Sequence, residues 1–274
     1  MLMALNNTGA RKLTIDEAIQ QKLITATATS NGKYNQESVQ ITMSNRSASK
    51  LIIVIPAGFS FYPGDEGEQT LVTTEDQFLA LEPNASNKKW IKAFCSEASD
   101  SSPTEFSTFT FGKTKNPSIQ KLVDYTNAHK VSPSTLQDAM WAVSSDRSIS
   151  NIVAETPEDK ALRTFISELT GKKDAWYTSP QNYELNESRN IVSETVKIQG
   201  DLVFSLNEST TFYQEIRKKD GEVMMKGQKT LTLAKGDNIK FHFRIEVTGW
   251  EKGEYDVFVI STKNKIVTQY EFAV

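Results

Sequence analysis

The chain has 274 residues, of which 38% are hydrophobic and 24% charged, and its formal net charge is −3. This size and composition predict one large or two ordinary globular domains with a sizeable core. Phosphate binding requires clustered lysine and arginine, but the basic residues here are scattered among acidic ones, which argues against a general nucleic-acid or anionic-membrane surface. No apolar run approaches about 18 residues, and no transmembrane segment is predicted.

The chain begins Met1-Leu2-Met3-Ala4-Leu5-Asn6. This start lacks the basic region and the long apolar region of a secretory signal peptide. Two alternatives remain open at this point. The protein is cytosolic, or it is a secreted mature chain that has been given a new start.

Residues 14–22 are expected to form a short helix, because Thr14-x-x-Glu17 is a capping-box pattern that precedes helically spaced apolar residues. Strand patterns follow. Val39, Ile41 and Met43 alternate with polar residues, and residues 51–55 form a continuous apolar run. Short strands of this kind with turn residues between them indicate an antiparallel β-sandwich.

A helical block is expected over residues 116–171. Each of its three helices opens with a capping residue followed by proline, at Asn116-Pro117, Ser132-Pro133 and Thr156-Pro157. Proline is favoured at the first helical position because its missing N–H would have no partner there. The third helix places Leu162, Phe165, Ile166 and Leu169 on one face, and Gly171 is expected to cap its C-terminus.

Residues 172–192 are polar and are interpreted as a linker or a long connection, after which strand patterns return. Residues 241–247 alternate strictly between apolar and polar types, and Asp220-Gly221 predicts a hairpin turn. The predicted fold is therefore mainly β. An antiparallel β-sandwich with a helical segment (residues 12–175) is followed by a smaller immunoglobulin-like β-sandwich (residues 192–274).

The sequence offers few residues for catalysis. It contains two histidines, His129 and His242, and one cysteine, so no zinc cluster with recognised spacing can form. No glycine-rich phosphate loop and no nucleophile elbow are present. The acidic residues 65–68 lack the spacing of a calcium loop and are interpreted as a solvated turn. We predict no catalytic residue, metal site or cofactor, and a hydrolase is disfavoured.

The single cysteine, Cys95, ends a strand-like run and follows Phe94. Further along the chain a helical segment reads Gln137-x-Ala139-x-Trp141. This combination resembles the thioester domains of bacterial surface adhesins, although Cys95 and Gln137 are closer in sequence than is usual there. The resemblance covers about residues 90–145. It implies that the Cys95 sulfur and the Gln137 side chain condense into an internal thioester that binds a target amine covalently.

In this interpretation Trp141 lies one helical turn after Gln137 and, together with Phe94, shields the bond from water. Leu136, Ala139, Met140 and Val143 pack the helix onto the sheet. In the alternative interpretation Cys95 is a small inert core residue, Gln137 a surface amide and Trp141 a core aromatic residue.

The segment Gly249–Val259 resembles the Gly-x-Tyr-x-Val strand of bacterial extracellular immunoglobulin-like modules and of type 9 secretion sorting domains. Together the two resemblances imply a non-enzymatic, secreted or surface-exposed adhesion protein, whose partner is a protein or an amine-bearing surface. The alternative is a structural or assembly subunit made of two β-sandwich modules, with an inert Cys95.

Overall fold

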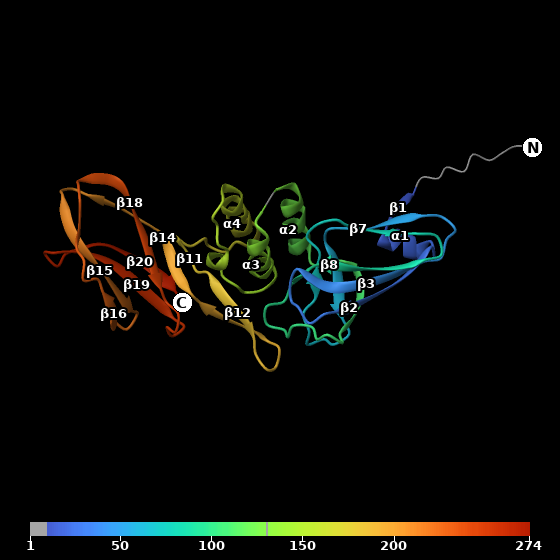
Figure 1. Ribbon diagram of the computed structural model, residues 1–274. Coiled ribbons are helices and arrows are strands. Elements are labelled where there is room, and N and C mark those ends of the chain that lie inside the picture. Colours follow the sequence, from blue (N-terminus) through green and yellow to red (C-terminus); the bar gives the residue numbers. More distant parts are fainter. Residues whose placement is uncertain (1–9, 130) are drawn as a thin grey trace, which may run out of the picture. The chain divides into compact units, whose positions relative to one another are not determined.

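The computed structural model describes residues 10–129 and 131–274, and it confirms a mainly β chain with a helical segment (Figure 1). The chain start at Met1–Asn6, which we examined for a signal peptide, lies outside the described residues. Among those residues, no helix has the length and apolar character needed to cross a membrane.

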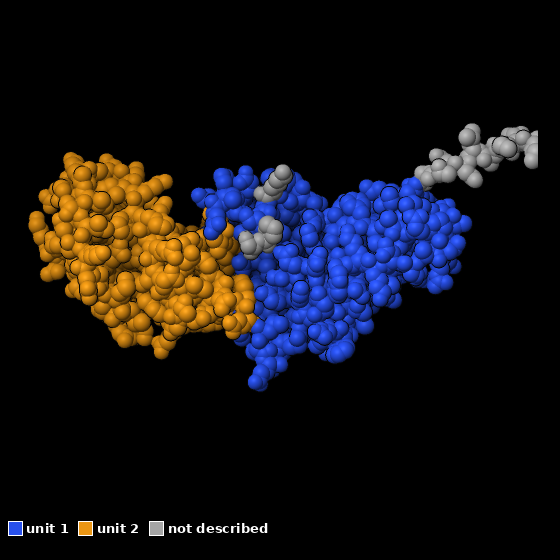
Figure 2. Space-filling view, viewed as in Figure 1, with its two compact units in different colours: residues 1–147, 155–172, 185–192 blue, residues 148–154, 173–184, 193–274 orange. Residues whose placement is uncertain are grey.

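The chain divides into two compact units (Figure 2). Unit 1 comprises residues 1–147, 155–172 and 185–192, and unit 2 comprises residues 148–154, 173–184 and 193–274. The expected boundaries were 12–175 and 192–274. They differ from the observed units because residues 148–154 and 173–184 belong to unit 2 and residues 185–192 belong to unit 1. Residues 148–154 belong to unit 2, where the hydroxyl groups of Ser150 and Ser179 lie 2.7 Å apart. Residues 185–192 belong to unit 1, where Arg189 donates to the carbonyl of Gly32 at 2.6 Å.

Unit 1 contains ten strands in two sheets. The larger sheet is antiparallel throughout, with the order β8-β3-β2-β10-β5-β6-β9. The smaller sheet has the order β1-β4-β7, and its β1 and β4 are parallel. The strands are β1 (Arg11–Thr14), β2 (Ile24–Ser30), β3 (Glu37–Asn45), β4 (Leu51–Ile55), β5 (Phe59–Pro63), β6 (Leu71–Val72), β7 (Gln77–Leu81), β8 (Ser86–Lys92), β9 (Phe94–Cys95) and β10 (Thr108–Lys113).

The core of unit 1 follows the apolar patterns of the sequence. Val39, Ile41 and Met43 alternate along β3 and are fully buried, as the period-two pattern predicted. The apolar run of β4 is buried at Leu51, Ile53, Val54 and Ile55. The capping box at Thr14 is also present, and it starts α1 (Ile15–Gln20).

Three helices complete unit 1: α2 (Pro117–Ala128), α3 (Pro133–Ser144) and α4 (Pro157–Thr170). Each has proline in its first turn, as expected. Asn116 and Thr156 accept hydrogen bonds as N-caps, and Gly171 ends α4 in the left-handed region at φ 69°. Ser132 departs from the expectation, because its side chain accepts no capping hydrogen bond from α3.

Unit 2 contains two antiparallel sheets, with the orders β11-β14-β18 and β16-β15-β19-β20; β17 also pairs with β15. A short 3-10 helix, η1 (Ile149–Asn151), also belongs to this unit. The strands are β11 (Tyr177–Thr178), β14 (Lys197–Leu206), β15 (Thr210–Lys218), β16 (Val223–Lys226), β17 (Leu231–Leu233), β18 (Gly236–Glu246), β19 (Glu254–Ser261) and β20 (Ile266–Ala273).

One apolar cluster lies between the two sheets of unit 2, as in a β-sandwich. Leu202 and Phe243 come from one sheet, and Phe212, Val257 and Phe272 from the other. The alternation over residues 241–247 is confirmed at Phe243, Ile245 and Val247, which are buried. The hairpin signal at Asp220-Gly221 lies between β15 and β16, and Gly221 has a φ of 93° that favours glycine.

The expected linker over residues 172–192 was wrong in one respect, because this stretch forms strands. It contains β11 and β12 (Gln181–Leu185), and β12 pairs with β13 (Ile191–Thr195). The stretch is polar because no residue of β12 is fully buried. Tyr177 of β11 is buried in the unit 2 core, and its hydroxyl accepts a hydrogen bond from the backbone N–H of Ala273 at 2.9 Å.

We therefore expect residues 173–274 to fold cooperatively by themselves and residues 190–274 to be clearly less stable. The shorter fragment lacks Tyr177 and Trp176, and its loss of buried aromatic area should lower the melting temperature by more than about 10 °C. Thermal denaturation followed by circular dichroism measures both fragments. Equal melting temperatures would contradict a role for β11 in the unit 2 core.

Candidate functional site

Cys95 lies in the two-residue strand β9, at one end of the larger sheet of unit 1. It pairs with Leu71 of β6. Its backbone N–H donates to the carbonyl of Tyr34, 2.9 Å away, in the connection between β2 and β3. The side chain is fully buried. The main chain at Cys95 is therefore held from both sides of the strand.

The structure brings Gln137 to Cys95. Gln137 is the fifth residue of α3, and only 5% of its surface is exposed. Its side-chain Nε2 donates to the backbone carbonyl of Cys95 at 2.8 Å. Its Oε1 is buried and has no hydrogen-bond partner. The expectation that Gln137 and Cys95 meet agrees with this geometry, whereas a Gln137 lying on the surface does not.

The C-terminal end of α3 is also attached to the chain that follows Cys95. The hydroxyl groups of Ser144 and Ser145 both donate to the carbonyl of Ser96, and the latter bond measures 3.3 Å. The backbone N–H of Ala98 donates to Ser145 Oγ at 3.0 Å. Because these bonds lie about two helical turns after the Gln137 contact, they add a second point of attachment and restrict sliding of α3 along β9.

Both expected shielding residues are buried. Trp141 has no exposed surface, and its ring stacks on that of Tyr34 with centroids 6.0 Å apart. Phe94 is 3% exposed. Tyr34 itself is half-buried and was missed in the sequence, because it stands in a polar connection with no periodic pattern. Its contact with Trp141 adds a third aromatic side chain beside the Cys95–Gln137 pair.

The thiol of Cys95 is held in its protonated form. Burial, with a further contribution from the Glu97 carboxylate, raises the pKa of Cys95 well above its usual value. Burial likewise raises the pKa of Glu97. The loss of hydration on burial is the largest cause of this rise, and it disfavours an anionic sulfur at Cys95. The pair therefore consists of a neutral, buried thiol and an amide whose nitrogen is bound to the main chain of the same cysteine.

A buried carboxylate sets the start of α3. Asp159, 1% exposed, accepts hydrogen bonds from the Ser132 backbone N–H at 2.9 Å and the Ser132 hydroxyl at 2.7 Å. It also accepts from the hydroxyl group of Thr156 at 2.8 Å, at the start of α4. Asp159 thus holds the residue that precedes α3 and joins the beginnings of two helices.

Burial alone would raise the pKa of Asp159, but the hydrogen bonds from Ser132 and Thr156 outweigh it and lower the pKa. The stabilisation is therefore fully present above the pKa of an unfolded aspartate, and it is lost as the pH falls through the lower pKa of the folded state.

We expect Asp159→Asn to destabilise the protein by about 1–3 kcal/mol at neutral pH, because buried donors lose a charged acceptor. The loss should shrink in acid, where the wild-type carboxylate is protonated. Urea denaturation at several pH values measures this effect. Glu158→Gln, which alters an exposed acidic residue in the same turn, is the matched control, and an equal loss there would argue against the role of Asp159.

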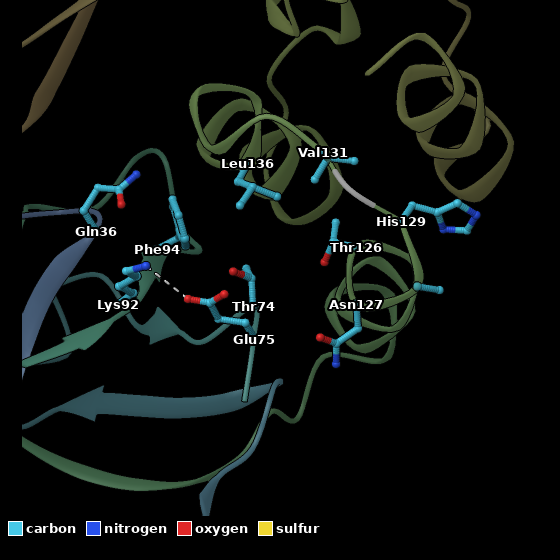
Figure 3. A pocket seen from close by; sticks show the side chains of 11 residues that line it. Gln36, Thr74, Glu75, Lys92, Phe94, Thr126, Asn127, His129, Val131 and Leu136 are labelled. Carbon is cyan, nitrogen blue, oxygen red and sulfur yellow. Dashed lines mark ion pairs between the residues drawn. The ribbon is translucent and has the colours of Figure 1, made fainter. Parts of the chain in front are cut away.

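Unit 1 contains a cavity of about 620 Å³ that neither Cys95 nor Gln137 lines (Figure 3). Phe94 and Leu136 line it, and they directly precede Cys95 and Gln137 in the chain. Glu75 and Lys92 form an ion pair of 3.3 Å at its side. Residues from the end of α2 form the opposite wall.

The remaining candidates form no site in the described parts of the chain. No group of three or more His, Cys, Asp or Glu side chains there is arranged to hold a metal ion. In the acidic segment, Asp65 accepts from the backbone of Gly67 at 2.9 Å, a turn contact. His242 is exposed and lies 3.2 Å from Asp201, while the ring of His129 stacks on Tyr125.

No protein-family model matches the chain, and no curated protein matches it. Among solved structures, two of β-glucosidase from Kluyveromyces marxianus are similar to it. One is the selenomethionine-labelled enzyme, with 11% identity and a TM-score of 0.22. The match covers 86% of this chain and 44% of that chain. The other, in complex with glucose, has 10% identity, a TM-score of 0.22, and coverage of 92% and 50%. The chain spans about half the length of these structures, and a likeness this low carries no argument about fold or activity.

Proposed function

We propose that this protein is a secreted or surface-exposed adhesion protein that binds an amine-bearing target covalently through a Cys95–Gln137 thioester. The observation that carries the proposal is the buried hydrogen bond from Gln137 Nε2 to the Cys95 carbonyl. The Gln137 side chain is held there at the main chain of a residue 42 positions away in sequence, and reactive groups held near each other gain a large effective concentration.

The unpartnered Oε1 of Gln137 supports the same reaction. A buried amide oxygen without a donor costs about 1–3 kcal/mol. Condensation replaces the amide by a thioester, whose carbonyl oxygen is a weaker acceptor and is therefore less costly to leave without a donor. The burial of Trp141 and its contact with Tyr34 further limit access of water to the bond.

The proposed chemistry has two balanced steps. The Cys95 thiol adds to Cδ of Gln137, the C–N bond breaks, and ammonia leaves with the thiol proton. A primary amine of the target then attacks Cδ, the C–S bond breaks, and the sulfur receives the amine proton. The product is a free thiol and a γ-glutamyl amide, so each molecule reacts once and the protein is not an enzyme.

A second function is favoured by one observation. Cys95 is fully buried with a raised pKa, which is typical of an inert core thiol. In that case the chain is a structural or assembly subunit built from two β-sandwich modules. The extracytoplasmic location in either proposal rests on the resemblances to bacterial surface and extracellular modules.

We expect the purified protein to weigh one ammonia less than its sequence, and Cys95→Ala and Gln137→Ala should each abolish this deficit. Methylamine should add at Gln137 and release a thiol that can be alkylated. Intact and peptide mass spectrometry measure both effects. A peptide carrying unmodified Gln137 would favour the inert subunit, whereas Glu at that position would show that a thioester had formed and hydrolysed.

We also expect Tyr34→Ala to speed hydrolysis of the bond by about tenfold, because water reaches the face of Trp141 that Tyr34 now covers. The loss of the ammonia deficit over time measures this rate. Tyr62→Ala, which removes an aromatic ring away from the pair on β5, is the control. Equal hydrolysis in both variants would show that Tyr34 does not shield the bond.

A further inference from the structure

Another cavity lies at one end of the unit 2 sandwich, and it contains neither residue of the proposed thioester. It has a volume of about 520 Å³ and is formed by the connection between β14 and β15 and by the hairpin between β19 and β20. Ligand pockets range over about 300–1,000 Å³, so this volume suits a small ligand. Loops at the ends of β-sandwiches often bind ligands, because the strands hold them in place.

Backbone hydrogen bonds fix the walls of this cavity. The Ser261 N–H donates to the Lys265 carbonyl at 2.8 Å, and the Lys265 N–H donates to Ser261 Oγ at 3.1 Å, so the β19–β20 hairpin is closed. The Thr262 N–H donates to the Thr211 carbonyl at 2.9 Å, which joins this hairpin to the start of β15. A ligand therefore meets preformed walls, and little of the binding free energy goes into ordering them.

Hydroxyl groups dominate the lining of the cavity. They belong to Ser205, Ser209, Thr210, Thr211, Ser261 and Thr262. Each hydroxyl can both donate and accept, so the lining complements a ligand that itself carries several hydroxyl groups. Five of these hydroxyls are oriented by a hydrogen bond within the protein. Within the described residues, the side chains of Thr262 and Asn207 have no such partner, and they remain open to a ligand.

The charged groups at the cavity favour one negative charge on the ligand. Lys263 Nζ lies 3.8 Å from Glu208 Oε1, and both side chains are largely exposed. Lys265 forms no ion pair with any described residue, so its ammonium group is open to a carboxylate. No arginine is among the lining residues, and the Glu208 carboxylate repels a bare anion such as phosphate while it can accept from a hydroxyl.

The lining also has a small apolar part, to which Leu206, Ile266 and Val267 belong. Ile266 is 51% exposed, and covering its apolar surface favours binding. A sugar ring has one apolar face of C–H groups and a rim of hydroxyl groups. A uronic acid, which is a sugar with one carboxylate, therefore matches the apolar part, the hydroxyl groups and Lys265 at once.

We propose that this cavity binds an acidic saccharide, a sugar chain that carries carboxylate groups. The ammonium group of Lys265 contacts a carboxylate, and Thr262 and Asn207 bind ring hydroxyls. The binding is reversible, and it does not depend on the proposed thioester, because all of these residues belong to unit 2 and Cys95 and Gln137 belong to unit 1.

The test measures the binding of two trisaccharides to the full chain by isothermal titration calorimetry. One consists of galacturonic acid. The other consists of galactose, which has a hydroxymethyl group in place of each carboxylate. We expect the acidic trisaccharide to bind at least about fivefold more tightly, because a hydrogen bond between charged groups is stronger than one between neutral groups. Added salt should weaken the binding of the acidic trisaccharide alone.

Three variants at exposed positions locate the site. Lys265→Gln should weaken binding of the acidic trisaccharide by about tenfold and leave the neutral one unchanged. Thr262→Val removes a hydroxyl at nearly constant volume and should weaken both. Lys252→Gln is the matched control in the turn between β18 and β19, at the other end of β19, and it should change neither affinity.

The proposal is overturned if the wild-type protein binds neither trisaccharide at millimolar concentration. Equal affinity for the two, or an equal loss in Lys265→Gln and Lys252→Gln, would refute the role of the carboxylate. Inorganic phosphate that displaces the acidic trisaccharide at equal concentration would show a simple anion site. Cys95→Ala should bind both trisaccharides as the wild type does, so the result is independent of whether the thioester forms.

Discussion

The site depends on one buried hydrogen bond, between the Gln137 side chain and the main chain of Cys95. A primary amide is costly to bury without partners. The bond from the Gln137 nitrogen therefore fixes the position of α3 along β9, the edge strand of the larger sheet. A shift of one residue would place Leu136 or Asp138 there, and neither side chain can supply the same bond to a carbonyl. The surrounding contacts hold α3 in the same position. Asp159 binds the start of the helix, and Ser144 and Ser145 attach its end to Ser96.

Burial has two opposite effects on the chemistry of Cys95. It raises the pKa of the thiol, which lowers the fraction of reactive thiolate. It also excludes water, which would otherwise hydrolyse an acyl bond. A thiol in this setting is slow toward outside reagents, while the amide of Gln137 is held at the main chain of the same residue.

The two units are not separated by a single linker, because the chain passes between them several times. Residues 148–154 and 173–184 leave the helical part and join unit 2, while residues 185–192 return to unit 1. Short polar contacts account for these exchanges, including the Ser150–Ser179 pair and the bonds of Arg189 to Gly32 and Pro103. Hydrogen bonds of this kind need no apolar pattern, and a polar stretch can therefore hold strands that composition alone describes as a connection.

The sequence by itself determined the elements whose signals are local. These signals depend on residues a few positions apart, and each is found in place. They are the alternation of β3 and β18, the capping box of α1, the prolines that open α2 to α4, and Gly171 after α4. The sequence also singled out Cys95 and Gln137. Only the tertiary structure decided that Gln137 is buried against Cys95 and that Tyr34 covers Trp141. It also decided that Asp159 of another helix holds Ser132 at the start of α3 and that a cavity opens beside Phe94. These features arise from contacts between residues distant in the chain, and such contacts leave no periodic trace in a single sequence.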